Sequence, residues 1–567
     1  MDKIVVLDFG SQTSALIGRR IRELGVYSEL IPGDTPFSSI IPEGVGGVDA
    51  NGNRVRGIVF SGSPESVMKD GIVPDPKLYS CGLPLLGICY GLQRMTCDNG
   101  GLVEAMGERE YGSVEVKGQI PGANETFADS EKLRRFFAAF DPAVSLDTIK
   151  NNGASSSAGQ PSAKEFHISS WMSHSDQVTR LAPGFRQYGI SAAGSPSVLV
   201  HESKPWFGVQ FHPEVANCGR GLELLAAFVF GVSRCVGEWT MEQYVKEVCA
   251  GIAEKVGNKT VLLLISGGVD STVVAALLLK SLNAGQVHLL YIDTGLMRKN
   301  ETSTVKVSLE RLGAKYLHVI NCEEEFLKAL KGVEDPEAKR KAIGDLFITI
   351  QERETAKLGL KDAFLAQGTI YPDILESGKG SEKNAKVIKS HHNVGSALVD
   401  AKRRSGLVIE PLEKLFKDEV RSLGRFLGVD EEVLRRHPFP GPGISVRILG
   451  EVTREKCDIL READAIYIEE LKKRRGPSGR TLYDEIWQAF PVLLPIRSTG
   501  ISGDSRNYSR VLALRAITST DAMTAGVYPF EVSDLLEISA RITGKVKEIG
   551  RVTYDITSKP PATIEWE

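Results

Sequence analysis

Two series of short apolar runs, each alternating with helical stretches, limit the folds open to this chain more than any other feature. The first series has a helical stretch at about 12–24 and strand-like runs at 4–7, 57–60 and 84–88. The second follows an amphipathic stretch at 238–253 and has runs at 260–265, 287–292, 316–320 and 363–366. Such alternation is typical of parallel α/β sheets. The sequence predicts two α/β domains, the second beginning near residue 236.

A third domain is expected after residue 435. The segment 438–443, Pro-Phe-Pro-Gly-Pro-Gly, cannot propagate a helix. The remainder mixes helical stretches with β-rich runs such as 491–495. A chain of 567 residues also exceeds what one hydrophobic core usually serves. We predict domains at 1–235, 236–435 and 436–567, the last a smaller α+β domain.

Charge and apolar content exclude several classes of protein. Lys and Arg total 69 against 72 Asp and Glu, a formal net charge of −3, so no overall basic field favours nucleic acid. Apolar stretches such as 224–232 fall short of the roughly 20 residues needed to cross a bilayer, and the acid at position 2 is unlike a secretory signal. None of the eight Cys forms a C-x-x-C pair, which argues against a disulfide scaffold or structural zinc. We expect a cytoplasmic protein with no membrane or nucleic-acid partner.

Three segments stand apart from the alternating pattern. Residues 42–57 are rich in Gly, and 147–163 are rich in Asn, Ser, Gly and Ala; both are interpreted as insertions. The second has too few apolar residues to order itself. Between 376 and 404, seven basic residues stand against three acids. We expect a mobile cationic lid over phosphates there, with a plain solvated loop as the alternative.

A cysteine nucleophile is predicted in the first domain. An apolar strand runs into Gly-Ile-Cys-Tyr-Gly at 87–91, and a helix is expected from about Leu92. The two flanking glycines permit a sharp turn that exposes the Cys89 thiol, and a helix N-terminus favours the reactive thiolate. His212 and Glu214 stand at an expected strand end, where alternation turns both side chains to the same side. Because a nucleophilic Cys needs a base that a carboxylate orients, the three form a candidate triad for acyl transfer.

With Asp-Phe-Gly-Ser-Gln at 8–12 and Ser-Gly-Ser-Pro-Glu-Ser at 61–66, these residues resemble the class I glutamine amidotransferases over about residues 1–235. The resemblance implies a flavodoxin-like domain that hydrolyses glutamine. It implies an oxyanion hole of backbone N–H groups from Gly62 and Tyr90. Glutamine binding is implied for Gln93, Ser173, His174 and Asp176. Ser175 stands where that family usually has Gly.

A phosphate loop is predicted in the second domain. The strand at 260–265 leads into Ser-Gly-Gly-Val-Asp-Ser-Thr at 266–272, with a helix expected from about Val273. Glycines directly after a buried strand let backbone N–H groups approach a pyrophosphate, and the Walker A ending is absent. The string resembles the PP-loop ATP pyrophosphatases, whose sheet is adenine-nucleotide α-hydrolase-like and which adenylate a carbonyl oxygen. The predicted ATP-binding residues are Ser266, Gly267, Gly268, Val269, Asp270, Ser271 and Thr272.

Five later segments are similar to the glutamine-hydrolysing GMP synthetase family: 291–301, 366–373, 388–395, 436–443 and 559–567. The resemblance implies that ATP adenylates XMP at its C2 oxygen and that ammonia from glutamine then yields GMP, AMP and pyrophosphate. It also implies a homodimer formed through the C-terminal domain. The implied XMP contacts are Arg298, Gln488, Arg551, Lys559, Ile564 and Glu565.

Mg²⁺ is the expected cofactor, because carboxylates together with phosphate oxygens suit this ion. Asp270 and Asp373 are its candidate ligands. Lys389, inside the basic segment, is a candidate to stabilise charge on the phosphates, and Lys417 and Asp418 are weaker candidates at the same site.

Two alternatives remain open at this point. Another PP-loop ligase, such as an NAD synthetase-like enzyme, would act on nicotinate adenine dinucleotide in place of XMP. Asparagine synthetase, a further enzyme of this kind, is disfavoured because its glutaminase uses an N-terminal Cys, whereas this chain begins Met-Asp. A regulatory protein that kept the fold and lost catalysis is disfavoured by the intact Cys89, His212 and Glu214.

Overall fold

A computed structural model of the chain describes residues 1–41, 48–49, 52–69, 71–122, 129–151, 164–376, 397–502, 505–519 and 525–567. These residues divide into two compact units, an N-terminal unit within Met1–Tyr244 and a C-terminal unit that begins at Val245. Each unit is described by itself below. No helix among the described residues is long and apolar enough to span a membrane.

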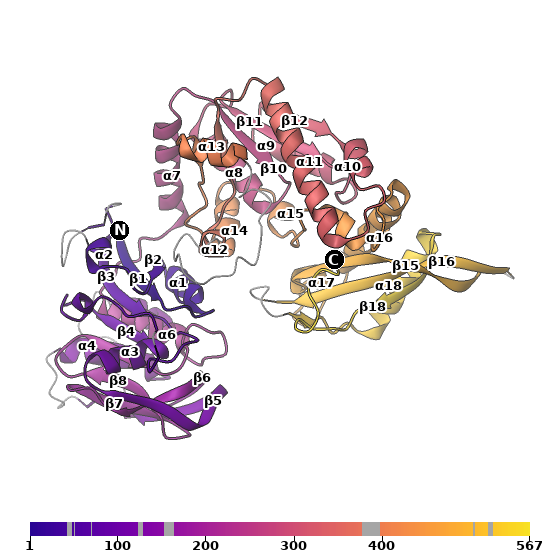
Figure 1. Cartoon of the computed structure of the whole chain (residues 1–567). Helices are drawn as coiled ribbons and strands as arrows, with labels where there is room; N and C mark the ends of the chain where they lie inside the picture. Colours follow the sequence, from indigo (N-terminus) through magenta and orange to yellow (C-terminus); the bar gives the residue numbers. More distant parts are fainter. Residues whose placement is uncertain are drawn as a thin grey trace. The chain divides into compact units, whose positions relative to one another are not determined.

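The N-terminal unit is built on one mixed sheet, ordered β2-β1-β3-β4-β9-β8-β7-β5-β6 among the described residues. Five neighbouring strands are parallel: β1 (Asp2–Asp8), β2 (Tyr27–Pro32), β3 (Arg54–Phe60), β4 (Leu85–Ile88) and β9 (Trp206–Val209). The others are antiparallel: β5 (Leu102–Gln119), β6 (Glu165–Arg180), β7 (Phe185–Ser191) and β8 (Pro196–His201). Figure 1 shows the long strands β5 and β6 running together at one edge of this sheet. The predicted parallel α/β core is confirmed, but the prediction missed the antiparallel half.

The helices of this unit are α1 (Ser14–Glu23), α2 (Phe37–Ile40), α3 (Tyr90–Asp98), α4 (Ser130–Phe137), α5 (Leu146–Asn151) and α6 (Gly221–Ala226), continued by the π-helix Ala227–Val232. Helix α5 corrects the expectation that 147–163 is unordered from its start. Its Ile149 is buried, so one apolar side chain suffices to hold this short turn against the core. Residues 152–163, half of the Gly-rich 42–57 (42–47 and 50–51), and 377–396 lie outside the described residues.

The C-terminal unit begins with a parallel sheet ordered β12-β11-β10-β13-β14. Its strands are β10 (Val261–Ile265), β11 (Val287–Asp293), β12 (Tyr316–Asn321), β13 (Phe364–Ala366) and β14 (Val408–Ile409). Helices accompany it: α7 (Met241–Val256), α8 (Val269–Ser281), α9 (Glu301–Arg311), α10 (Glu323–Ala329), α11 (Pro336–Lys357), α12 (Tyr371–Glu376), α13 (Ala397–Arg404), α14 (Lys417–Phe426) and α15 (Glu431–Leu434). Every strand predicted from 260 to 366 is present, so the second alternating series is confirmed.

The remainder of the unit packs helices against a second sheet. The elements are α16 (Arg454–Lys473), α17 (Leu482–Glu485), β15 (Gln488–Ser502), β16 (Ser505–Thr518), β17 (Gly526–Val527), α18 (Val532–Lys545) and β18 (Ile549–Tyr554). One cluster of buried side chains runs from Leu290 of β11 through Tyr467 of α16 to Leu514 of β16. Because this core is continuous, the residues on either side of 436 belong to one compact unit; the domain boundaries themselves stay predictions.

Helix α13 corrects the expectation of a mobile segment up to residue 404. Lys402 is buried and donates through Nζ to the carbonyl of Lys361 at 2.9 Å. Arg403 pairs with Glu410 at 3.0 Å. Two of the basic residues assigned to the lid are therefore held by the protein, because anchored carbonyl and carboxylate acceptors already occupy their donors.

Candidate active sites

Cys89 occupies a tight turn between β4 and α3. Its φ is +51°, a value that residues other than Gly rarely adopt and that clusters at functional sites. The flanking glycines are required by packing: a Cβ at Gly91 would lie 2.2 Å from the Phe60 carbonyl oxygen, and one at Gly87 would lie 2.6 Å from the Leu92 nitrogen. Helix α3 starts at Tyr90, two residues earlier than predicted. The first free N–H groups of the helix therefore follow the thiol directly.

His212 and Glu214 form a buried hydrogen-bonded pair. The distance from His212 Nδ1 to Glu214 Oε1 is 2.7 Å, and the side chains are 7% and 0% exposed. The expectation that both stand on a strand is wrong, since β9 ends at Val209. A turn brings them together instead, and the His212 N–H is held by the Trp171 carbonyl at 2.9 Å.

The electrostatics of this pair suit an acid–base role. Burial lowers the pKa of His212, but the Glu214 carboxylate and the Cys89 sulfur raise it more, so the pKa lies well above its usual value. Burial raises the thiol pKa of six other cysteines: Cys81, Cys97, Cys218, Cys235, Cys322 and Cys457. A high pKa keeps a thiol protonated and unreactive, so these six are structural.

The predicted glutamine-site residues are gathered around Cys89. A Cβ at Gly62 would lie 3.1 Å from His212 Cε1, so this backbone abuts the imidazole. The Ser173 carbonyl oxygen is 3.9 Å from the Cys89 sulfur. Gln93 Nε2 donates to the Asp176 carbonyl at 2.8 Å, and the same oxygen is 2.9 Å from His174 Nδ1.

Two buried residues beside the pocket were missed by the sequence analysis. Gln210 Nε2 lies 3.6 Å from the Cys89 sulfur, and its Oε1 accepts from Gln93 at 3.2 Å. Glu110 on β5 lies with Oε2 3.1 Å from His174 Nε2. Gln210 directly follows β9 and stands two positions before His212, so its place beside the motif is the one signal that the sequence offered. Glu110 has no such signal, because only the pairing of β5 with β6 brings it to His174.

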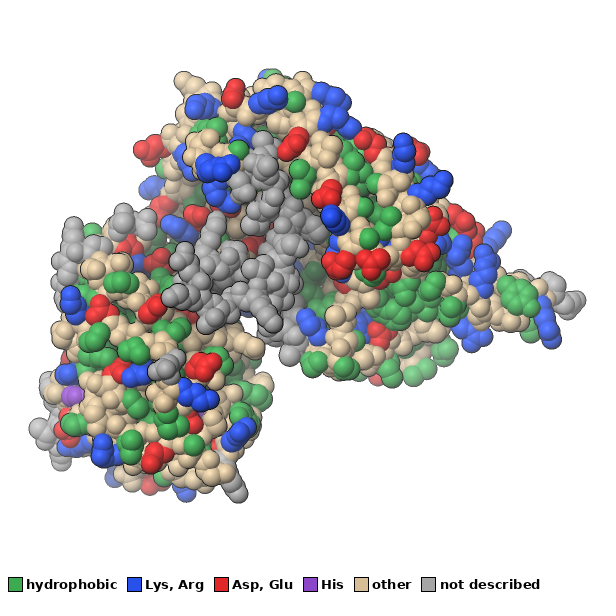
Figure 2. Space-filling view, viewed as in Figure 1, with side chains coloured by type: hydrophobic (Ala, Val, Ile, Leu, Met, Phe, Trp, Pro, Cys, Tyr) green, Lys and Arg blue, Asp and Glu red, His purple; other side chains and the backbone are tan. Residues whose placement is uncertain are grey.

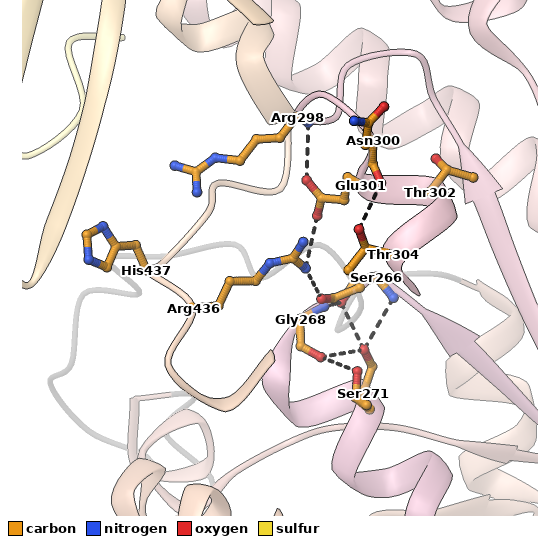
Figure 3. Close-up of polar contacts among 12 residues, drawn as sticks. Ser266, Gly268, Ser271, Arg298, Asn300, Glu301, Thr302, Thr304, Arg436 and His437 are labelled. Carbon is orange, nitrogen blue, oxygen red and sulfur yellow. Dashed lines mark hydrogen bonds and ion pairs between the residues drawn. The ribbon is translucent and has the colours of Figure 1, made fainter. Parts of the chain in front are cut away.

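The predicted phosphate loop is a compact hydrogen-bonded turn at the N-terminus of α8 (Figure 3). Ser271 Oγ donates to the Gly268 carbonyl and lies 3.2 Å from Ser266 Oγ, while Thr272 Oγ1 donates to the same carbonyl at 2.8 Å. Gly267 has a φ of +76°, which favours glycine. Helix α8 starts at Val269, four residues earlier than predicted. The second half of the loop is thus the first helical turn, where unpaired N–H groups attract anions.

Asp270 meets a lysine from a distant helix. Lys417 Nζ lies 2.7 and 2.6 Å from the two carboxylate oxygens, and both side chains are partly exposed. The described residues contain no cluster of three or more His, Cys, Asp or Glu that could hold a metal alone. One carboxylate beside an anion-binding helix terminus fits Mg²⁺ bridging to substrate phosphates, the usual mode of this ion. Asp373 Oδ2 accepts from the Ile370 N–H at 3.0 Å.

Three of the six predicted XMP residues are linked by contacts. Glu565 accepts from Gln488 Nε2 at 2.8 Å and is bound by both Nε and Nη2 of Arg447. The guanidinium of Arg298 and that of Arg447 lie over the ring of Phe439, at 5.3 and 5.1 Å from its centroid. The sequence analysis missed Arg447 and Phe439.

The other three XMP candidates have separate partners. Arg551 Nε donates to Ser498 at 2.7 Å, Lys559 pairs through its backbone with Ala525, and the Ile564 carbonyl accepts from Arg515 at 3.4 Å. Lys389 lies outside the described residues, so the structure places it nowhere.

Comparisons with known proteins agree along the whole chain. Family profiles match for glutamine amidotransferase class-I at residues 5–232, NAD synthase at 241–344 and GMP synthase C terminal domain at 478–566. GMP synthase [glutamine-hydrolyzing] of Bartonella bacilliformis is 44% identical over 100% of this chain and 99% of its own length. The chain belongs to the glutamine-hydrolysing GMP synthases. The relatives from Symbiobacterium thermophilum and Aquifex aeolicus, 44% and 43% identical, likewise cover 100% of this chain and 99% of their own lengths.

The extent of these matches decides between the two PP-loop alternatives. A match to NAD synthase alone would leave the acceptor open, since it covers only residues 241–344. The GMP synthases match the amidotransferase part and the C-terminal part as well. A GMP synthase combines glutamine hydrolysis with an ATP-dependent PP-loop domain, as the sequence predicted.

Proposed function

We propose that this chain makes GMP from XMP, with glutamine hydrolysed at Cys89 and ATP bound at the 266–272 loop. The observation that carries the glutaminase half is the buried His212–Glu214 pair beside a cysteine with a φ of +51° at a helix N-terminus. A nucleophile, an oriented base and helix N–H groups are the parts that acyl transfer needs.

In the glutaminase step, the Cys89 thiolate attacks the carboxamide carbon of glutamine. The backbone N–H groups of Gly62 and Tyr90 stabilise the oxyanion. The His212 imidazolium gives its proton to the departing ammonia, and neutral His212 then takes a proton from the water that hydrolyses the thioester to glutamate. Glu214 keeps the ring in one orientation throughout. The glutamine itself is bound by Gln93, Ser173, His174 and Asp176.

In the synthetase step, the C2 oxygen of XMP attacks the α-phosphorus of ATP and pyrophosphate leaves. Ammonia then attacks C2 and AMP leaves. Loop N–H groups and the hydroxyls of Ser266 and Ser271 bind the pyrophosphate portion. Asp270, with Asp373 as a second candidate, would hold Mg²⁺, which would neutralise charge on the phosphates. Lys417, and Lys389 from the basic segment, add positive charge at the phosphates.

XMP is bound by Arg298, Gln488, Arg551, Lys559, Ile564 and Glu565. The contact of Gln488 with Glu565 supports a polar site for base or ribose, and the Arg298 guanidinium over Phe439 supports a positive charge and an aromatic ring beside it. A cytoplasmic location is part of the same proposal.

The C-terminal domain forms the homodimer. Its described surface exposes seven large apolar side chains: Ile496, Ile501, Tyr508, Val532, Leu536, Ile556 and Trp566. Figure 2 shows hydrophobic side chains grouped on the visible face of this part. Such exposure is typical of protein interfaces, and a second copy of the chain is the partner we propose. Light scattering should give twice the 61.7 kDa chain mass, and Leu536→Glu should shift it toward the monomer.

The decisive experiment incubates the protein with XMP, Mg-ATP and glutamine and identifies the nucleotide products by chromatography. GMP and AMP should appear in equal amounts. A parallel reaction offers nicotinate adenine dinucleotide in place of XMP. AMP formed only in that second reaction would overturn the proposal.

A further inference from the structure

Two residues outside the assigned sites lie between the phosphate loop and the XMP candidates. Glu301 is the first residue of α9, and Arg436 precedes the Pro-rich segment after α15. Figure 3 shows both side chains between Arg298 and the loop at 266–271. Glu301 ends one of the segments that are similar to GMP synthetases, 291–301, and Arg436 begins another, 436–443. Neither residue has a part in the proposed reaction steps.

Each oxygen of the Glu301 carboxylate has its own contact. Oε2 accepts from the Arg298 backbone N–H at 3.1 Å, and Oε1 lies 3.1 Å from Arg436 Nη1. The Glu301 side chain is 3% exposed. A buried carboxylate with both oxygens engaged is held firmly, because loss of either contact leaves charge without compensation.

Arg436 continues the chain of contacts into the loop. Its Nη1 also donates to the Gly267 carbonyl oxygen. That carbonyl and the Gly268 N–H belong to one planar trans peptide and point in opposite directions. A guanidinium that fixes the carbonyl therefore fixes the direction of the Gly268 N–H, which donates to Ser266 Oγ at 3.3 Å and so helps to hold the shape of the loop. Helix α9 supports the same point: a Cβ at Gly267 would lie 2.9 Å from Val305 Cγ2 and 3.4 Å from Glu301 Oε1.

We propose that Glu301 and Arg436 form a bridge that couples ATP binding at the 266–272 loop to XMP binding at Arg298. They act as positioning residues: one carboxylate and one guanidinium hold a loop peptide and the Arg298 backbone in a fixed relation. This rests on the proposed XMP contact of Arg298. Adenylation needs the α-phosphorus and the C2 oxygen in line, so a shared support for both sites assists the step.

Coupling between two sites is a measurable free energy and must be reciprocal. The test measures the XMP dissociation constant by calorimetry with and without a saturating α,β-methylene analogue of ATP, which cannot release pyrophosphate. Wild-type protein should bind XMP roughly 5- to 150-fold more tightly with the analogue present. Glu301→Gln keeps an acceptor for the Arg298 N–H and removes the charge that holds Arg436. The coupling ratio is the XMP dissociation constant without the analogue divided by that with it. In Glu301→Gln this ratio should fall to within about threefold of one, while the XMP dissociation constant without the analogue should change less than about threefold.

A purely structural role predicts a different result, namely a lower melting temperature with the ratio intact. The matched control is Glu462→Gln, which breaks an exposed pair with Lys299 near the same helix and should leave the ratio at the wild-type value. Arg436→Lys is the second variant, because it keeps the positive charge beside Glu301. Its shorter side chain reaches one acceptor at a time, so its ratio should also fall.

The outcomes separate the bridge from the function it rests on. An unchanged ratio in folded Glu301→Gln, an unchanged ratio in Arg436→Lys if the first variant does not fold, or no coupling in the wild type each overturn the bridge. Failure of the wild type to make GMP from XMP, ATP and ammonia would instead overturn the proposed function.

Discussion

The two candidate active sites differ in how their charged groups are held. At the glutaminase site, His212 and Glu214 are buried and bonded to each other in the arrangement that catalysis uses. At the nucleotide site, charged side chains are bound by protein counterions: Asp270 by Lys417, Arg298 by Asp464, and Glu565 by Arg447. The reacting group at the first site is the uncharged carboxamide of glutamine. At the second site these ion pairs compete with substrate groups, so substitutions there should change substrate binding as well as chemistry, whereas substitutions at the first site should change chemistry.

The largest effect is expected for Cys89→Ala. Without the nucleophile no thioester forms, so glutamine-dependent GMP formation should fall by roughly 10⁴-fold or more. Ammonia-dependent formation should stay within about twofold of wild type, because the nucleotide site is untouched. Cys97→Ala, on the same helix, is the control and should retain both activities. Loss of the ammonia-dependent reaction in folded Cys89→Ala would contradict the division of labour between the sites.

The second prediction concerns Asp270→Ala. Removing the carboxylate takes away the proposed Mg²⁺ ligand and leaves Lys417 without its partner, so pyrophosphate release should fall about 10³-fold with either nitrogen donor. Pyrophosphate is measured by a coupled assay over a range of Mg²⁺. Asp458→Ala, at an exposed position of α16, should behave as wild type. Wild-type pyrophosphate release by Asp270→Ala would exclude the metal assignment.

Glu214→Gln tests whether the buried pair sets the pH range of the glutaminase. The carboxylate raises the pKa of His212, so His212 keeps its proton to a higher pH than a free imidazole and loses it as pH rises through the raised pKa. Gln carries no charge, so the alkaline limb of kcat/KM should move to lower pH, with a rate loss of about 10²-fold. The control Glu202→Gln alters an exposed carboxylate and should leave the limb in place.

The free energy of unfolding should also depend on pH through the raised pKa of His212. Since the folded pKa of His212 is raised, its pairing stabilises the fold fully below its unfolded value of about 6.5 and ceases to do so as pH rises through the folded value. The difference in unfolding free energy between wild type and Glu214→Gln should therefore shrink toward alkaline pH. A difference that grows with pH would contradict the assignment.

The sequence predicted what lies within contiguous motifs, and it predicted distant partners only where each partner stood in a motif of its own, as with Cys89 and the His212–Glu214 pair. Cys89 with its glycines and the 266–272 loop are local patterns, so their turns could be predicted. The helix starts were misplaced by two to four residues because the turn residues Tyr90 and Val269 already belong to α3 and α8.

Lys417, a candidate at the Asp270 site from its sequence motif, does pair with Asp270 across 147 positions. Glu110 carried no comparable signal, because it reaches His174 only through the pairing of β5 with β6. Strands β5 and β6 were missed because they are long, and β6 alternates buried and exposed residues, unlike the short buried runs that predict a parallel sheet.

The smallest effect is expected for Gln210→Ala, which should change the glutaminase site and leave the nucleotide site as it is. Gln210 is fully buried, and its amide lies against the Cys89 sulfur and accepts from Gln93. Removing it deletes one donor near the nucleophile and leaves Gln93 Nε2 with only its contact to the Asp176 carbonyl, a loss of about one hydrogen bond. We expect glutamine kcat/KM to fall about tenfold with ammonia-dependent synthesis unchanged. Gln187→Ala, at an exposed position of β7, is the matched control. A drop in the ammonia-dependent reaction would mean that the substitution also disturbs the nucleotide site. The two sites would then not act independently, contrary to the comparison of their charged groups.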